Sequence, residues 1–370
     1  MRISALPMVA ALVFAGACEK KEGPVSKEPG GSSSVKAPPG GDDKGGGKVA
    51  LSGAGASFPA PLYIKWVSEY HKAHPDIEIN YQSIGSGGGI KQILEKTVDF
   101  GASDAPMKDD ELAKASGKLV HIPTTIGAVV LAYNVPGVPQ GLKLTRKAVA
   151  GIFLGDIKKW NDPEIAKNNP DAKLPDSDIS VSYRSDGSGT TAVFTSFLAS
   201  ASPAWKEKVG EGKAVKFPIG SGAKGNEGVS GQVKSTPGTI GYVELAYAKQ
   251  TGLSYGVVEN AGGKYIEPSL SSISAAAASL SAKMPDDLRA WIIDAPGDAS
   301  YPISSFTFIM VYEDMPDATK GKALGQFLWW AVHDGQKLGG ALDYAPLPDE
   351  VVSKIEAKLK GLKAGGQPIL

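Results

Sequence analysis

Apolar residues follow two distinct periodicities in this chain from Val49 onward. Apolar and polar side chains alternate over residues 77–81, which predicts a strand. Apolar residues recur three or four positions apart after the loop at 53–59 and after the glycines at 85–89, and this spacing predicts a helix behind each loop. The same patterns predict further strands at 49–51, 100–104, 122–134, 179–183 and 303–312, and helices at 108–115, 146–153, 194–198, 319–333 and 348–360.

Strands and helices alternate along this part of the chain. Alternation of this kind predicts an α/β fold, here of two lobes, each a mostly parallel sheet flanked by helices. We interpret the apolar run at 122–134 as a strand that crosses from the first lobe into the second. We expect the first lobe to comprise 49–125 plus 302–370 and the second 126–301, with a hinge between them and ligands beyond the carboxyl ends of the strands.

The first 17 residues have the pattern of a secretory signal peptide, with one arginine, a short apolar run and small residues before Cys18. The run is too short to span a bilayer as a permanent helix. Small residues before the single cysteine of the chain also resemble a bacterial lipobox, which predicts a lipid anchor on Cys18; an ordinary cleaved signal is the alternative. We therefore expect residues 18–48 to form a lipidated cysteine and a disordered linker rich in Gly, Pro, Ser and Lys.

The composition excludes several classes of partner. Lys plus Arg and Asp plus Glu each total 39 in 370 residues, so the formal net charge is zero. This balance argues against a nucleic-acid binder and against attachment to anionic lipid by charge. Glycine contributes 46 residues, about 12% against the usual ~7%, which indicates a linker and places where the backbone approaches another group closely.

Three loops share one design, in which small residues and a serine stand between a strand and a helix. Their serines are Ser57, Ser86 and Ser188. The first turn of a helix has unpaired N–H groups and a partial positive charge, so such a loop favours a bound anion. Each serine alone is better explained as an ordinary helix N-cap, but three such loops at strand ends favour an anion site.

Charged side chains accompany these loops. Arg184 and Asp186 flank the third loop, and a guanidinium offers a planar fork that suits an oxyanion. A surface ion pair worth less than about 1 kcal/mol is the alternative. Asp104 is a carboxylate at a strand end in a site built for anions; it is either a helix N-cap ahead of Pro106 or the acceptor of a hydrogen bond from a ligand that still carries a proton.

Six motifs are longer and more specific than these single residues. They are GAGASFPAP at 53–61, VDFGASDAP at 98–106, IKKWND at 157–162, DGSGT at 186–190, GNEG at 225–228 and GYVE at 241–244. Together they resemble the periplasmic phosphate-binding protein family of high-affinity ABC phosphate importers, from Val49 to about Val352. The resemblance implies a two-lobed periplasmic-binding-protein-like fold in which phosphate is buried between the lobes and held only by hydrogen bonds.

The resemblance also implies which residues bind phosphate. In the first lobe these are Ser57, Phe58, Ser86 and Asp104, and in the second Arg184, Ser188, Gly189 and Thr190, with Asp186 supporting Arg184. Two positions depart from the family pattern: Ser57 replaces a frequent threonine and keeps its hydroxyl, and Gly87 replaces a common second serine. Asp104 would accept a hydrogen bond from the proton that phosphate keeps and sulfate lacks, so we expect it to select phosphate.

This family membership would imply high-affinity binding of inorganic phosphate and its delivery to an ABC permease in the inner membrane, without catalysis, cofactor or metal. We then expect a monomer in the periplasm or cell envelope.

Three alternatives stay open. A phosphoester hydrolase would need a base or a metal cluster, and neither is visible in the sequence. A receptor for sulfate, molybdate or an organic anion is disfavoured by Asp104, and an adhesin or scaffold would not need three anion loops.

Overall fold

A computed structural model describes residues 47–370 of the chain. The predicted signal peptide, Cys18 and the predicted linker up to residue 46 lie outside the described residues. The strands and helices that the sequence predicts are present, with bounds that differ by a few residues. The strand predicted at 49–51 extends to Gly55 as β1 (Val49–Gly55), the helix predicted at 108–115 is only α3 (Asp109–Leu112), and the helix predicted at 194–198 is longer at both ends, as α6 (Gly189–Ala201).

A nine-stranded sheet forms the centre of the described residues, in the order β2-β1-β3-β12-β4-β8-β6-β7, with β9 paired to β4. β1 pairs in parallel with β2 (Ile77–Ser83) and β3 (Phe100–Ser103). β6 (Ser180–Arg184) pairs in parallel with β7 (Ser221–Ala223) and β8 (Thr239–Glu244). These two groups are parallel, as predicted, because helices connect their successive strands.

Two long strands join these groups and run antiparallel to their neighbours. β4 (Leu119–Asn134) pairs with β12 (Ser304–Tyr312) up to Ala128 and with β8 from Val129 onward. The sheet is therefore mixed, which corrects the expectation of mostly parallel sheets. Every residue of β12 and all but the last of β4 are buried, since both strands have apolar side chains on both faces of the sheet.

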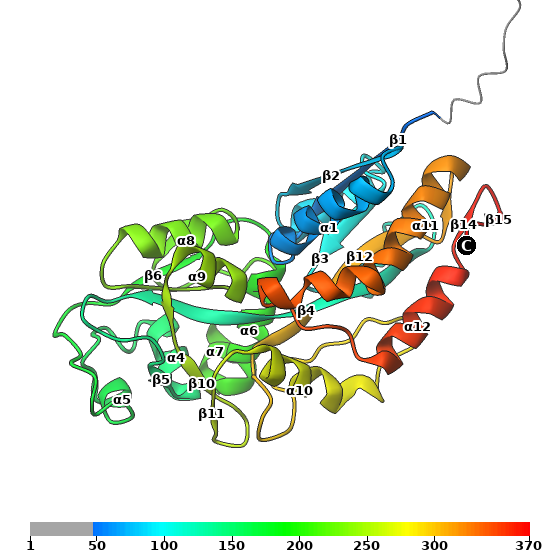
Figure 1. Ribbon diagram of the computed structural model, residues 1–370. Coiled ribbons are helices and arrows are strands. Elements are labelled where there is room, and N and C mark those ends of the chain that lie inside the picture. Colours follow the sequence, from blue (N-terminus) through cyan, green and yellow to red (C-terminus); the bar gives the residue numbers. More distant parts are fainter. Residues whose placement is uncertain (1–46) are drawn as a thin grey trace, which may run out of the picture. The chain divides into compact units, whose positions relative to one another are not determined.

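The apolar run at 122–134 is part of β4, a single long strand that contacts the first group of strands through β12 and the second through β8 (Figure 1). We call the part with β1–β3 and β12 the first half, and the part with β6–β8 the second half. The two lobes predicted at 49–125 plus 302–370 and at 126–301 stay a prediction, and β4 changes its neighbour at Val129. That the halves move as lobes about a hinge stays a prediction.

Helices cover the first half. α1 (Ala60–Ala73) contacts β2, α2 (Ser86–Leu94) contacts β1 and β3, and α11 (Ala318–Val332) contacts β1 and β4. Apolar residues at helical spacing give α1 a buried face that includes Trp66 and Tyr70. Burial of this face holds the start of α1, and therefore the loop before it, at the carboxyl end of β1.

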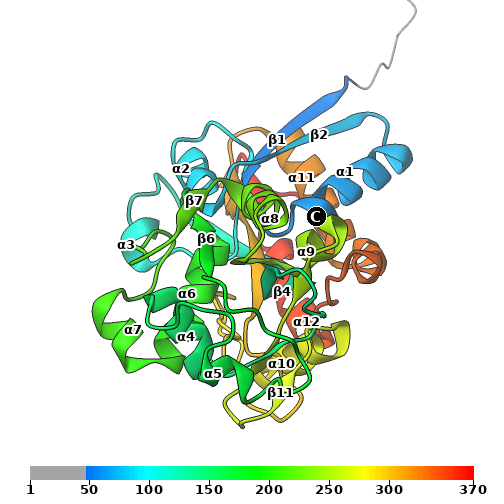
Figure 2. The same ribbon diagram turned by 90° about the vertical axis from the view of Figure 1, so that its left-hand side faces the viewer.

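Helices also cover both sides of the second half. α8 (Gly225–Ser235) and α9 (Leu245–Thr251) lie on the opposite side of β4 from α4 (Arg146–Leu154) and α6 (Gly189–Ala201) (Figures 1 and 2). α6 is buried over most of its length. A helix buried in this way is fixed in position, so its first turn is a rigid part of any site at its N-terminus.

The remaining elements complete the described chain. They are β5 (Lys143–Leu144), α5 (Pro163–Ala166), α7 (Pro203–Lys208), β9 (Ser254–Tyr255), β10 (Val257–Glu259), β11 (Tyr265–Ile266), α10 (Leu270–Ser281), β13 (Asp314–Met315), η1 (Asp334–Leu338), η2 (Gly340–Leu342), α12 (Asp349–Lys360), β14 (Lys363–Ala364) and β15 (Gln367–Pro368). No helix within residues 47–370 has the length and hydropathy needed to cross a membrane.

Candidate functional site

The three serine loops meet at the carboxyl ends of the strands. Ser57 lies between β1 and α1, Ser86 is the first residue of α2, and Ser188 directly precedes α6. All three side chains are buried. The N–H of Gly87 donates to the carbonyl oxygen of Gly187 at 2.8 Å, so the second and third loops, which belong to different halves, are in direct contact.

Ordinary helix capping explains one of these serines. The Oγ of Ser188 accepts the N–H of Thr191 at 3.0 Å, as an N-cap does. The N-cap positions of α1 and α2 are Pro59 and Gly85, and neither makes a side-chain cap. The hydroxyls of the other two loops are therefore not used to begin a helix, which favours the anion-site interpretation for them.

Asp104 follows β3 and is 1% exposed. Its Oδ1 accepts the hydroxyl of Thr307 at 2.9 Å, and its Oδ2 lies 3.5 Å from the Oγ of Ser86. The next helix begins only at Asp109, so the alternative that Asp104 caps a helix is wrong. Burial raises the pKa of this carboxyl from 3.8 to about 7, against the opposing effects of Thr307 and of the positive charge of Arg184.

Arg184 and Asp186 form a bidentate pair at the end of β6. The guanidinium Nε and Nη2 donate to the two carboxylate oxygens at 2.7 and 2.6 Å. The side chain of Arg184 is only 1% exposed, so the alternative of a surface ion pair is wrong. Burial acts to raise the pKa of Asp186, but the hydrogen bonds and charge of Arg184 outweigh it and hold that pKa below its ordinary value.

The first turn of α6 packs directly against Asp104 and Ser86. A Cβ placed on Gly189 would lie 2.5 Å from the Oδ2 of Asp104 and 2.5 Å from the Oγ of Ser86. Glycine is therefore required for this approach, which brings the positive end of the α6 dipole to Asp104. The hydroxyl of the next residue, Thr190, accepts from the Nη1 of Arg184 at 3.3 Å.

Two tyrosines hold the first serine loop. The hydroxyl of Tyr247 donates to the carbonyl oxygen of Ser57 at 2.6 Å, and that of Tyr344 donates to the carbonyl oxygen of Phe58 at 2.6 Å. A trans peptide directs a carbonyl and the following N–H to opposite sides. The bond from Tyr247 therefore fixes the direction of the N–H of Phe58.

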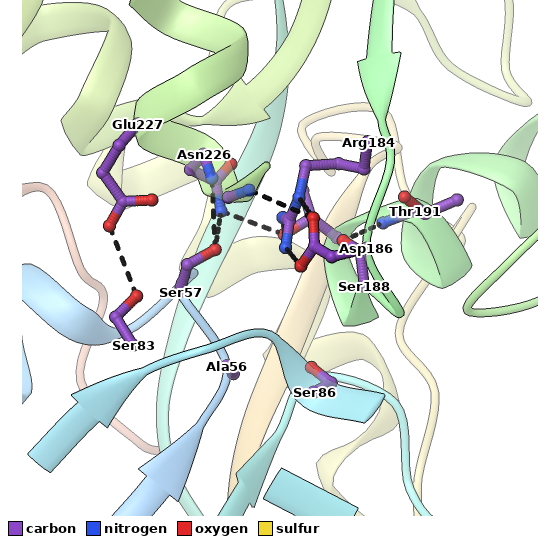
Figure 3. A network of polar contacts seen from close by, with 12 residues as sticks. Ala56, Ser57, Ser83, Ser86, Arg184, Asp186, Ser188, Thr191, Asn226 and Glu227 are labelled. Carbon is purple, nitrogen blue, oxygen red and sulfur yellow. Dashed lines mark hydrogen bonds and ion pairs between the residues drawn. The ribbon is translucent and has the colours of Figure 1, made fainter. Parts of the chain in front are cut away.

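All nine site residues predicted at 57–190 thus lie in one buried region, in direct contact or through shared neighbours. Figure 3 shows Ser57, Arg184 and Asp186 around a further residue, Asn226 of α8. The Nδ2 of Asn226 donates to the Oγ of Ser57 at 2.9 Å and to the Oγ1 of Thr190 at 3.1 Å. Asn226 stands in the GNEG motif at 225–228, but nothing in that motif predicted a place in the site.

The donor set suits a small oxyanion. Hydroxyls, a guanidinium and the first turn of a buried helix all present hydrogen-bond donors, whereas Asp104 is an acceptor. Within residues 47–370, no group of three or more His, Cys, Asp or Glu side chains is arranged to hold a metal ion. An oxyanion that has kept one proton would match both the donors and the single buried acceptor.

Comparison with known proteins gives consistent matches. Residues 35–334 match the family model described as the PBP superfamily domain. The chain is 47% identical over 311 residues to the phosphate-binding protein PstS of Pasteurella multocida (strain Pm70), a match covering 84% of this chain and 90% of that protein. It is 46% identical over 310 residues to the protein of the same name from Xylella fastidiosa (strain 9a5c), covering 84% of each chain.

The fold has solved counterparts as well. An X-ray structure of a phosphate-binding protein from Stenotrophomonas maltophilia superposes with a TM-score of 0.64 at 23% identity, covering 84% of this chain and 93% of that one. Together with the family model, this similarity confirms the predicted fold class.

Proposed function

The chain belongs to the PstS family of phosphate-binding proteins within the PBP superfamily, and from this membership we propose how its buried site holds phosphate. The protein binds inorganic phosphate for import by an ABC transporter. The proposed phosphate ligands are Ser57, Phe58, Ser86, Asp104, Arg184, Ser188, Gly189 and Thr190, with Asp186 supporting Arg184. The observation that carries this assignment is the combination of many buried donors with one buried carboxyl acceptor, Asp104, whose pKa is raised to about 7.

Each donor matches one part of a phosphate ion. The N–H groups of Gly189 and Thr190 lie in the first turn of α6, where the helix dipole favours an anion. The guanidinium of Arg184 adds a full positive charge, and Asp186 keeps it oriented by two short hydrogen bonds. These donors come from the second half, so that half would supply most of the attraction for the charge of the ligand.

Asp104 supplies the specificity. Phosphate keeps at least one proton near neutral pH and can donate it to the carboxylate, whereas sulfate has no proton and would face a buried negative charge. A site built around a hydrogen bond from the ligand rejects an analogue that lacks this donor by about 10⁴–10⁵-fold. Asp104 therefore excludes sulfate in our proposal, although both ions have similar size and shape.

The ligands come from both halves, which supports a closing motion. The hydrogen bond from Gly87 to Gly187 and the contact of Gly189 with Asp104 are both between the halves. Each half alone holds part of the donor set, so phosphate would gain contacts in the closed form that the open form lacks. We propose that an ABC permease complex of the inner membrane recognises this closed, loaded form, and that the protein acts as a monomer.

The cellular setting and the absence of catalysis are proposals as well. We propose a location in the periplasm or cell envelope, with a lipid on Cys18 as the only attachment to the membrane. Proteins of this name are binding proteins, and the two carboxylates of the described site, Asp104 and Asp186, belong to no group of three or more side chains that could hold a metal ion. Binding without hydrolysis is therefore the activity that we propose.

Calorimetric titration tests this function. The protein is unfolded and refolded to remove bound anion and is then titrated with phosphate and with sulfate. We expect tight binding of one phosphate and binding of sulfate at least about 10⁴-fold weaker. Equal affinity for both ions would indicate a general oxyanion receptor and remove Asp104 from its proposed role. Failure to bind either ion would contradict the proposed function altogether.

A further inference from the structure

We infer that Asn226 is a positioning residue that orients the hydroxyls of Ser57 and Thr190, so that each must donate to the phosphate. This inference rests on the proposed function, because it concerns how two proposed ligands are prepared. Asn226 itself is fully buried and stands second in α8. Its Nδ2 donates to both hydroxyls, and Figure 3 shows its side chain close to Ser57.

The hydroxyl of Ser57 receives two hydrogen bonds from this one residue. Its Oγ accepts the backbone N–H of Asn226 at 3.2 Å and the side-chain Nδ2 at 2.9 Å. A serine oxygen has two lone pairs and one hydrogen. Because both lone pairs are occupied, the hydrogen of Ser57 can only donate, and it points away from Asn226.

The hydroxyl of Thr190 also accepts two hydrogen bonds, one of them from the same amide. Its Oγ1 accepts the Nδ2 of Asn226 at 3.1 Å and the Nη1 of Arg184 at 3.3 Å. Here too the two lone pairs are occupied, and only the hydroxyl hydrogen is left to form a further bond. Two hydroxyls that could either donate or accept are thereby restricted to donation, which is the role that an oxyanion requires.

The orientation of the amide is itself determined. The backbone N–H of Glu244 donates to the Oδ1 of Asn226 at 2.9 Å. The carbonyl end of the amide therefore faces β8, and its NH2 end must face the two hydroxyls. An aspartate at this position would have the same size but could only accept, so it would draw the hydroxyl hydrogens toward itself and away from the ligand.

Asn226 also links the two halves at the ligand. Ser57 belongs to the first half, whereas Thr190 and Asn226 belong to the second. The bond to Ser57 can therefore form only when the halves meet. The first-half hydroxyl would thus acquire its fixed direction on closure, at the moment when the phosphate becomes enclosed.

The experiment is a set of double-mutant cycles read out as the phosphate Kd of the full protein. Asn226→Ala is expected to raise the Kd about 30-fold, since two hydrogen bonds to a charged ligand lose their fixed direction. The same change is then made in the Ser57→Ala and Thr190→Val backgrounds. One of the two oriented hydroxyls is already absent there, so Asn226→Ala should cost only about 5-fold in each.

A purely structural role predicts a different result. If Asn226→Ala costs the same factor in all three backgrounds, or has no effect on the Kd of the otherwise unaltered protein, the inference is wrong. Asn260 provides a matched control, because it is a second buried asparagine whose amide bonds backbone groups at 262–300 and neither proposed ligand. Asn260→Ala should lower the Tm and leave the phosphate Kd within about 3-fold.

Two further points keep the outcome readable. If Asn226→Ala does not fold, Asn226→Asp preserves the volume of the side chain and replaces it in each cycle. The Kd of Asn226→Asp should rise by more than 30-fold in the unaltered background and by less in the other two. Tight phosphate binding by the unaltered protein establishes the proposed function separately, so additive cycles in a protein that binds phosphate refute only the role of Asn226.

Discussion

Asp104 and Asp186 occupy corresponding positions in the two halves, each at or just beyond the carboxyl end of a strand and each facing the same buried site. Their protonation behaviour is opposite. Burial raises the pKa of Asp104 to about 7, whereas Asp186, although burial also acts to raise its pKa, is held below its ordinary value by Arg184. Position in the fold therefore does not determine the chemistry of these carboxyls; their partners do.

The partners explain the difference. Asp186 receives both arms of a guanidinium and the N–H of Gly225 at 3.0 Å, so its negative charge is fully compensated. Asp104 receives the neutral hydroxyl of Thr307, lies 3.5 Å from the hydroxyl of Ser86 and is also approached by the backbone of Thr190, but it has no bidentate cationic partner. Burial without a compensating positive charge favours the protonated form of a carboxyl. Asp104 is thus suited to share the proton of a ligand, and Asp186 is suited to hold a cation in place.

The largest expected effect separates the two carboxylates by ligand selectivity. Asp104→Asn should reduce the ratio of sulfate to phosphate Kd by about 10⁴-fold, because an amide can donate to sulfate where the carboxylate repels it. Asp186→Asn should raise the Kd for phosphate and the Kd for sulfate by a similar factor of about 10. Arg184 loses its orientation in this variant, but no contact that depends on the proton of the ligand changes. Calorimetric titration of both variants with both ions measures these ratios.

Two outcomes of the same titration would contradict this prediction. If the two variants change the selectivity ratio equally, the difference in carboxyl environment has no functional meaning. An unchanged ratio in Asp104→Asn alone would show that another group excludes sulfate.

Sequence patterns correctly predict the strands and helices around the two carboxylates. They do not predict the direction of every strand. The periodicity around the serine loops and at 122–134 depends on burial of one or both faces, which the residues themselves specify. Periodicity does not distinguish parallel from antiparallel pairing. The antiparallel direction of β4 and β12 therefore could not be predicted, and the sheet was expected to be mostly parallel.

The charged and hydroxyl-bearing residues of the site were predictable from loop design and resemblance, but their supporting neighbours were not. Thr307 reaches Asp104 because of the register of β12, and Asn226 reaches Ser57 because α8 begins beside the first loop. These contacts join residues that are more than 160 positions apart. A single buried polar residue in a strand or helix has no periodic signal, so only the assembled fold identifies it.

The next effect concerns the stability of the ligand-free protein as a function of pH. The folded pKa of Asp104, about 7, lies above its ordinary value of 3.8, so protonated Asp104 supports the closed fold and this support is lost as the pH rises through about 7. Asp104→Asn should therefore be more stable than the unaltered protein at pH 8, by at most about 4 kcal/mol, and no more stable at pH 3.

Denaturant unfolding of phosphate-free protein at the two pH values measures this difference. The upper limit applies to a closed protein, because opening of the halves would hydrate the carboxylate and relieve part of the cost. Equal stability of variant and parent at pH 8 would indicate that Asp104 is already hydrated without ligand, so the specificity would then arise only on closure.

The smallest effect has the opposite sign and belongs to Asp186. Its pKa in the folded protein is lower than the ordinary value, so its charged form contributes stability that is present above the ordinary pKa and is lost as the pH falls through the folded pKa. Asp186→Asn should therefore destabilise the protein by about 1 kcal/mol more at pH 7 than at pH 2.5, a modest figure because the group is partly hydrated. Unfolding curves that show no such difference would mean that Arg184 finds an equivalent partner. A loss that grows toward low pH would assign to Asp186 the same raised pKa as Asp104 and remove the contrast between the two halves.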